Sequence, residues 1–142
     1  MPDQPSRPAQ QAAQAATRLA DFLAHPRPLR RGSLGERRMK CGKPNCPCAH
    51  DPDARHGPYF SLTRAHQGRT ESRYLSPGAA DLVRRQLDAH RELRARVREY
   101  EAAGEAWAEE ELNAETADAQ AEAEKGGSAR RSRRNSKPRS AS

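Results

Sequence analysis

The stretch YFSLTRAHQGRTESRYL, residues 59–75, predicts a β-hairpin. Its two halves have the composition of short strands, and the residues between them include a glycine suited to a tight turn. If Gln67 and Gly68 form the turn, opposite charges and apolar residues face each other, which supports this register. The expected pairs are Arg64 with Glu71, Leu62 with Arg73, Phe60 with Leu75, Thr63 with Ser72, and Ser61 with Tyr74.

The segment after the hairpin, SPGAADLVRRQLDAHRELRARVREYEAAGEAWAEEELNAE, predicts a long helix from Pro77 to at least Ala103. Ser76 suits the N-cap and Pro77 the first helical position. Apolar residues recur every three, four or seven positions, which is typical of one buried stripe. The stripe comprises Val83, Leu87, His90, Val97 and Tyr100. It is expected to pack against the hairpin and the N-terminal helix, and a self-association seam between two copies is the alternative.

Segments on either side complete an α+β fold. The alanine-rich run at residues 9–25 favours helix, and LRRGSLGERRMK at residues 29–40 predicts one short strand or turn. Residues 113–142 carry no packing signal and are expected to form a disordered tail, first acidic and then basic. The predicted organisation is a disordered start and helix at residues 1–28, a module with the cysteine loop, hairpin and long helix at residues 29–112, and the tail.

All three cysteines lie in CGKPNCPCAH, residues 41–50. The intervening glycine and prolines bend and stiffen the chain, which suits donors that converge on one ion. A tetrahedral zinc site needs a fourth ligand, and both His50 and His56 are close in sequence. His56 is favoured because HGPY leads from it into the hairpin. The predicted structural zinc ligands are Cys41, Cys46, Cys48 and His56. Alternatives are reduced structural thiols, an iron–sulfur cluster that lacks its fourth cysteine, or a Cys–His nucleophile that lacks an orienting group.

The composition is too polar for the whole chain to pack around one core, because 34% of the residues are hydrophobic, 4% aromatic and 32% charged. There is no continuous apolar run long enough to span a membrane, and the first residues lack the apolar core of a signal peptide. We therefore expect a cytoplasmic protein. In that reducing compartment, clustered cysteines favour a metal site over disulfides.

The net charge of +7 hides three segments of alternating sign. Residues 1–98 carry 19 basic and 9 acidic side chains, residues 99–124 carry 10 acidic and no basic ones, and residues 125–142 carry 7 basic and no acidic ones. An excess of arginines beside tyrosines predicts binding to DNA, with RNA also possible, although an ordinary solvated basic surface is the competing interpretation. The candidate nucleic-acid-binding residues are Arg37, Arg38, Lys40, Lys43, Tyr59, Arg64, Arg69, Arg73 and Tyr74.

Known catalytic motifs do not appear in the sequence. It lacks a phosphate-binding loop, a dinucleotide fingerprint, paired metal-binding carboxylates and a nucleophile elbow. We therefore expect a non-catalytic binding module. A protein-interaction adaptor, which would use the long helix and the acidic segment, is the alternative.

Three motifs together resemble a known family: G-S-L at residues 32–34, C-G-K-P-x-C-x-C at residues 41–48, and H-G-P-Y at residues 56–59 before a hairpin and R-Y at residues 73–74. This combination is similar to a bacterial family of small proteins that contain a domain of unknown function and are found near transposases. The resemblance covers roughly residues 31–100 and leaves out the alanine-rich start. It implies that the cysteine and HGPY segments form one unit, and it suggests a transposase-like partner.

Overall fold

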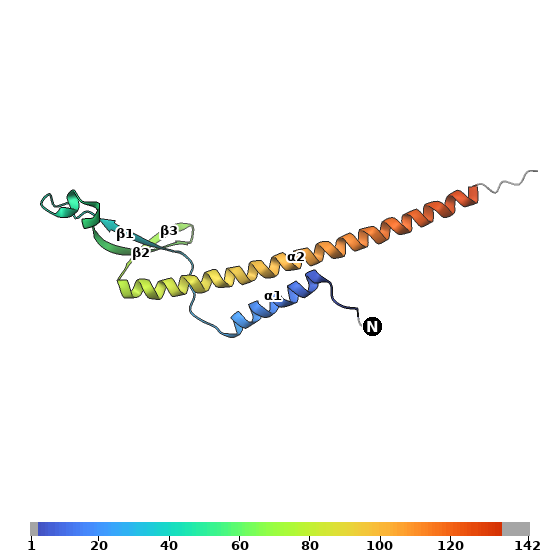
Figure 1. Ribbon diagram of the computed structural model, residues 1–142, viewed down its shortest axis with the longest axis horizontal. Helices are drawn as coiled ribbons and strands as arrows, with labels where there is room; N and C mark the ends of the chain where they lie inside the picture. Colours follow the sequence, from blue (N-terminus) through green and yellow to red (C-terminus); the bar gives the residue numbers. More distant parts are fainter. Residues whose placement is uncertain (1–2, 135–142) are drawn as a thin grey trace, which may run out of the picture. The chain divides into compact units, whose positions relative to one another are not determined.

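The computed structural model describes the backbone of residues 3–134 and the side chains of residues 3–127. The elements are helix α1 (Arg7–Ala24), strand β1 (Ser33–Met39), two short 3₁₀ helices (Pro47–Ala49 and Pro52–Ala54), strands β2 (His56–His66) and β3 (Arg69–Leu75), and helix α2 (Pro77–Arg134) (Figure 1). The predicted α+β fold is confirmed: it contains an antiparallel sheet and a long C-terminal helix.

The three strands form one antiparallel sheet in the order β1-β2-β3. The five pairs predicted for the hairpin are all present in the β2–β3 register. Gln67 and Gly68 form the turn, with φ of 50° and 74°. Positive φ at both central residues is typical of a type I′ turn, which matches the twist of the two strands. The segment at residues 29–40, predicted as a strand or a turn, contains β1, which makes β2 the central strand.

A small apolar core lies between one face of the sheet and the first turns of α2. Leu62 from β2 is 5% exposed, and it packs with the buried side chains of Val83 and Leu87 from α2. Leu34 and Leu75 contribute from the neighbouring strands. The other face of the sheet is left uncovered by α2. Because successive side chains of a strand point to opposite faces of the sheet, every second residue of each strand faces the helix.

The start of α2 follows the predicted cap. The Ala79 backbone N–H donates to the Ser76 hydroxyl oxygen at 3.2 Å, and Pro77 is the first helical residue. The hydroxyl thus satisfies one of the amide groups that have no partner at a helix N-terminus.

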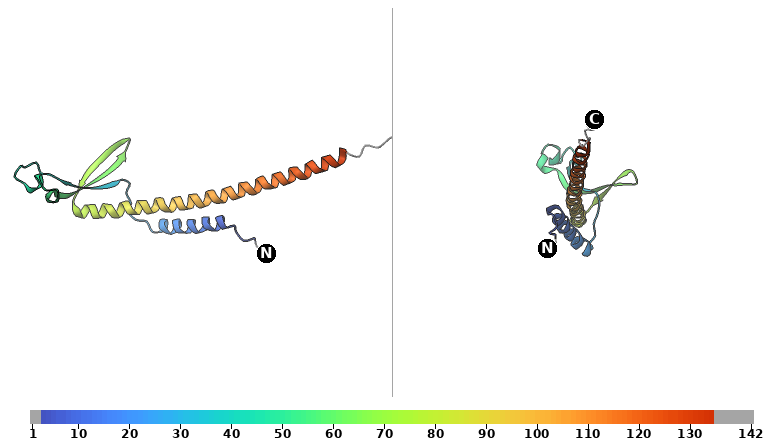
Figure 2. Two further views of the ribbon diagram at one scale, coloured as in Figure 1. Left: turned by 45° about the horizontal axis from the view of Figure 1, so that its top comes forward. Right: turned by 90° about the vertical axis from the view of Figure 1, so that its right-hand side faces the viewer.

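The chain divides into two compact units, each of which contains part of both helices. Residues 19–97 form one unit with the sheet, where Phe22 is buried beneath the Arg27 guanidinium, 4.4 Å from the ring centre. Residues up to Arg18 and those from Arg98 onward form the other. In that unit α1 lies along α2 (Figure 2), Ala12 and Ala15 are buried, and Arg18 and Glu99 form an ion pair of 3.3 Å.

Helix α2 continues well beyond the expected minimum end at Ala103, as far as Arg134. The segment at residues 113–134, for which the sequence predicted disorder, is therefore helical in the structure. Its alanines, glutamates and glutamine are strong helix formers, and extending an existing helix avoids the cost of nucleation. The rest of the predicted tail, residues 135–142, lies outside the described residues. Within residues 3–134, no helix combines the length and apolar character needed to cross a membrane.

Candidate metal centre and the basic surfaces of the sheet

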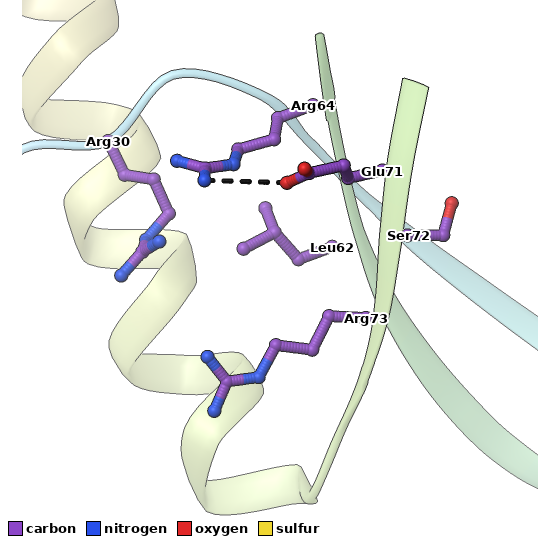
Figure 3. Close-up of a pocket in the computed structure, with 6 residues that line it drawn as sticks. All are labelled: Arg30, Leu62, Arg64, Glu71, Ser72 and Arg73. Atoms are coloured by element: carbon purple, nitrogen blue, oxygen red, sulfur yellow. Dashed lines mark hydrogen bonds and ion pairs between the residues drawn. The ribbon is translucent and has the colours of Figure 1, made fainter. Parts of the chain in front are cut away.

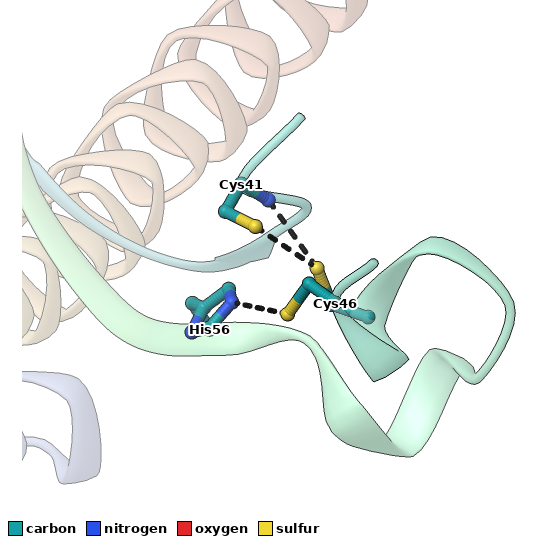
Figure 4. Close-up of side chains that lie close together, drawn as sticks. Cys41, Cys46 and His56 are labelled. Atoms are coloured by element: carbon teal, nitrogen blue, oxygen red, sulfur yellow. Dashed lines mark hydrogen bonds between the residues drawn. The ribbon is translucent and has the colours of Figure 1, made fainter. Parts of the chain in front are cut away.

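The cysteines lie on the loop that joins β1 to β2. Met39, the last residue of β1, is paired with His56, the first residue of β2. Cys41 follows two residues after Met39, so the antiparallel pairing alone brings it near His56. The loop then folds back and returns Cys46 and Cys48 to the same place (Figure 4).

Four donor atoms, the Sγ atoms of Cys41, Cys46 and Cys48 and a ring nitrogen of His56, lie within 4.8 Å of one another. The Cys41 and Cys48 sulfurs are 3.5 Å apart, and the Cys46 sulfur is 3.3 Å from His56 Nε2. Zinc–sulfur bonds of about 2.3 Å in a tetrahedron would separate neighbouring donors by about 3.8 Å. The cluster reaches that geometry through shifts of about 1 Å or less. These four residues can therefore hold a metal ion.

The local backbone positions the thiols. A 3₁₀ turn begins at Pro47 and carries Cys48 inward, where its side chain is 1% exposed. The Cys46 N–H donates to the Lys43 carbonyl at 3.2 Å, which closes the turn between the first two cysteines. The Cys41 backbone N–H also points at the Cys48 sulfur, at 3.4 Å. Hydrogen bonds of this kind orient a sulfur ligand.

Of the two histidines considered as the fourth ligand, the structure places only His56 beside the three cysteines. His56 lies in the cluster, whereas His50 is exposed at the end of the 3₁₀ turn, outside the group of mutually close donors. The His50 backbone N–H donates to the Pro47 carbonyl at 3.2 Å, so its backbone helps to close the turn. All three cysteines are free thiols and form no disulfide with one another.

The nine residues predicted to bind nucleic acid do not share one surface, because strand alternation divides several of them between the two faces of the sheet. The uncovered face carries Arg37, Tyr59 and Tyr74, which line one hollow of about 230 Å³. An adjoining hollow, lined by Lys40 and both tyrosines, ends at Cys41 and His56 of the Cys₃His cluster. We define the open face by these residues: Arg37, Met39, Lys40, Tyr59, Ser61, Thr63, Ser72 and Tyr74. Arg73 also borders the first of these hollows.

Arg64 and Arg73 project from the opposite side of the hairpin, toward α2 (Figure 3). Arg64 is paired there with Glu71 at 3.4 Å. The remaining candidates lie at the edges: Arg38 beside the irregular register near the end of β1, Lys43 in the cysteine loop, and Arg69 next to the hairpin turn. Arg30, which is not among the nine predicted residues, joins Arg64 and Arg73 in one pocket.

A small α+β module whose loop closes on a Cys₃His cluster is the class of protein that this fold and site define. Residues 9–85, more than half of the chain, match the model of a family described as a domain of unknown function, DUF6788. The chain belongs to this family. The match includes α1, which the motif-based resemblance had left outside, and it ends early in α2. No curated protein and no solved structure matches the chain.

Proposed function

We propose that this chain is a non-catalytic, zinc-stabilised module that binds nucleic acid through the open face and the neighbouring cysteine loop. The observation that carries the proposal is the open face itself. It presents two exposed tyrosines beside Arg37 and Lys40, in a part of the chain where basic residues outnumber acidic ones.

Zinc is the metal that the donor set favours. Three thiolates and one imidazole are soft and borderline ligands typical of structural zinc sites, whereas magnesium and calcium require oxygen ligands. A metal held by all four donors has no open position for a substrate, which supports a structural role over a catalytic one.

The tyrosines suit nucleic acid because an exposed ring can stack on a base. Tyr74 is 81% exposed. Tyr59 on β2 is the cross-strand partner of Arg37 on β1, so the two side chains are neighbours on the same face. Stacking of one base on an aromatic ring is worth roughly 1–3 kcal/mol, and nearby cations contact the phosphates. Within the part of the chain that the structure describes, Arg37, Lys40 and Lys43 have no ion pair with a carboxylate. Their charges are therefore available to an anionic strand.

The test is fluorescence anisotropy of labelled single-stranded DNA, duplex DNA and RNA with the metal-loaded chain. We expect binding that weakens about tenfold or more between 50 and 200 mM salt, because several phosphate contacts release counterions. Tyr74→Leu should lower the affinity about fivefold or more. Tyr100→Leu is the matched control, because Tyr100 is also exposed but is a residue of α2 and not of the sheet. Affinity that ignores salt, or equal effects of the two substitutions, would refute the proposal.

A second candidate function is a protein-interaction adaptor, and the exposed apolar residues of α2 favour it. Tyr100, Trp107 and Leu112 are all exposed on a helical segment that carries ten acidic side chains between residues 99 and 124. Such a helix can pair with a second copy or with a basic partner, for which the family resemblance suggests a transposase-like protein. Light scattering separates the candidates, because an adaptor that pairs through α2 should be dimeric and should dissociate when Trp107 and Leu112 are replaced by glutamine.

A further inference from the structure

A pocket of about 470 Å³ lies on the helix-facing side of the β2–β3 hairpin. Arg64, Leu62 and Arg73 leave the hairpin on its helix-facing side (Figure 3), and the pocket meets the hollow of the open face at Ser72 and Arg73, which border both. Three arginines turn into this space. The lining residues are Arg30, Leu62, Arg64, Glu71, Ser72 and Arg73.

The hairpin register brings two of the arginines together. Arg64 pairs with Glu71, and Leu62 pairs with Arg73, so Arg64 and Arg73 are diagonal neighbours on one face. Diagonal neighbours lie about 7–8 Å apart, which is within reach of two long guanidinium side chains that contact a common group. A one-residue change of the β2–β3 register would place the two side chains on opposite faces of the sheet.

The third arginine arrives from the segment between α1 and β1, and it is held in place by α2. The Arg30 backbone N–H donates to the Gln86 carbonyl at 3.0 Å, and Arg30 Nε donates to the Gln86 side-chain oxygen, also at 3.0 Å. This double contact orients the guanidinium and leaves its two terminal nitrogens for a ligand. Such prior orientation reduces the entropy lost when a ligand binds.

The charge of the pocket is unbalanced. Three guanidinium groups face one carboxylate, that of Glu71, which is engaged by Arg64 at 3.4 Å. Among residues 3–127, neither Arg30 nor Arg73 has an ion pair with a carboxylate. The buried side chain of Leu62 lies against the same space and limits its hydration. Like charges held close to an apolar wall repel one another, and a bound anion relieves that repulsion.

We propose that this pocket binds a phosphate group. Guanidinium groups from three directions offer more donors than the two oxygens of a carboxylate can accept, whereas a tetrahedral phosphate can accept from all three. The phosphate belongs either to free inorganic phosphate or to the backbone of a nucleic acid strand. The pocket thus adds a site on the face opposite the tyrosines, and the inference does not depend on the proposed function.

The test is a calorimetric titration of the metal-loaded full chain with inorganic phosphate, which should bind saturably at one site per chain. Arg73→Gln and Arg30→Gln should each lower the affinity about tenfold or more, because each removes charge-assisted hydrogen bonds. Arg94→Gln is the matched control: it removes the same charge from an exposed position of α2 that does not line the pocket, and phosphate affinity should hardly change. Glu71→Gln should raise the affinity about fivefold, since it removes the only negative charge in the pocket. That gain cannot result from unfolding.

A second arm, titration with an oligonucleotide at constant salt, distinguishes the two sources of phosphate. If Arg30→Gln weakens both ligands, the pocket holds a backbone phosphate; if it weakens only inorganic phosphate, the pocket holds the free ion. Arg30 is used here because it lines this pocket but not the open face. Absence of saturable phosphate binding to the unmodified chain overturns the inference, as do equal effects of Arg94→Gln and Arg30→Gln. Failure of the proposed function looks different, because oligonucleotide binding would then be absent while phosphate still bound.

Discussion

Replacing His56 by alanine tests the metal centre at its link to the sheet. His56 is the one donor that belongs to a strand, while the three thiols all lie on the loop. A metal bound to both therefore closes a loop from Cys41 to His56, and a cross-link around a loop of about 15 residues stabilises a fold by about 3 kcal/mol in the chain-entropy model. Losing that amount from a total of about 5–15 kcal/mol should lower the melting temperature by about 12–24 °C.

Two measurements should be made on His56→Ala and on the unmodified chain before and after chelation. Metal content per chain reports whether the site is filled. Hydrogen exchange of peptides from β2 reports whether the sheet has opened, which circular dichroism would report poorly because helices dominate this chain. We expect loss of the metal and faster exchange in β2, with little change in the part of α2 beyond Arg98.

His50→Ala is the matched control, since it removes an exposed imidazole of the same loop that lies outside the donor group. It should retain the metal and the exchange pattern of the unmodified chain. If His50→Ala loses the metal while His56→Ala keeps it, the assignment of the fourth ligand is refuted. If the unmodified chain purifies without metal and chelators leave its exchange unchanged, the whole metal centre is refuted.

Three further predictions concern the fold. Leu62→Ala should lower the free energy of unfolding by about 2–5 kcal/mol in urea titrations, whereas Leu82→Ala, at a residue 48% exposed, should change it by about 0.5 kcal/mol or less. Gly57→Ala should lower the free energy of unfolding by roughly 1–3 kcal/mol in the same assay. Gly57 has φ of 127°, and an added Cβ would lie 2.9 Å from the Arg37 carbonyl oxygen. An unchanged free energy would contradict this reasoning. Ser76→Ala should cost about 1 kcal/mol through loss of the helix cap, and an unchanged urea midpoint would show that the cap contributes nothing.

The hairpin could be predicted from sequence because its signals are local. Arg64 and Glu71 attract, Phe60 and Leu75 are both apolar, and the turn supplies a glycine, so only one register satisfies all three. The grouping of the thiols with His56 was also accessible, since HGPY ties that histidine to the start of a strand. Antiparallel pairing then brings the start of β2 to the end of β1.

Other features depend on tertiary contacts that no local pattern contains. The role of Arg30 comes from its bonds to Gln86, 56 residues away, and its own segment has no periodic pattern that would place it. The division of the basic residues between two faces, by contrast, has a local signal in the sequence. In the predicted register, Leu62 shares a face with Arg64 and Arg73, so the face that buries Leu62 against α2 must carry those arginines too.

Strand β2 contributes to every site described in this molecule, so a metal bound at its first residue would affect more than stability. The strand begins with His56, presents Tyr59 on the open face, buries Leu62 in the core and then directs Arg64 into the pocket. The β1–β2 register is irregular between Arg37 and Met39, next to His56. A slip of one residue there would invert the faces of the strand. A metal held by His56 and the loop after β1 would oppose such a slip at one end, while Leu62 opposes it from the core, so the metal would help to determine which side chains lie on each face.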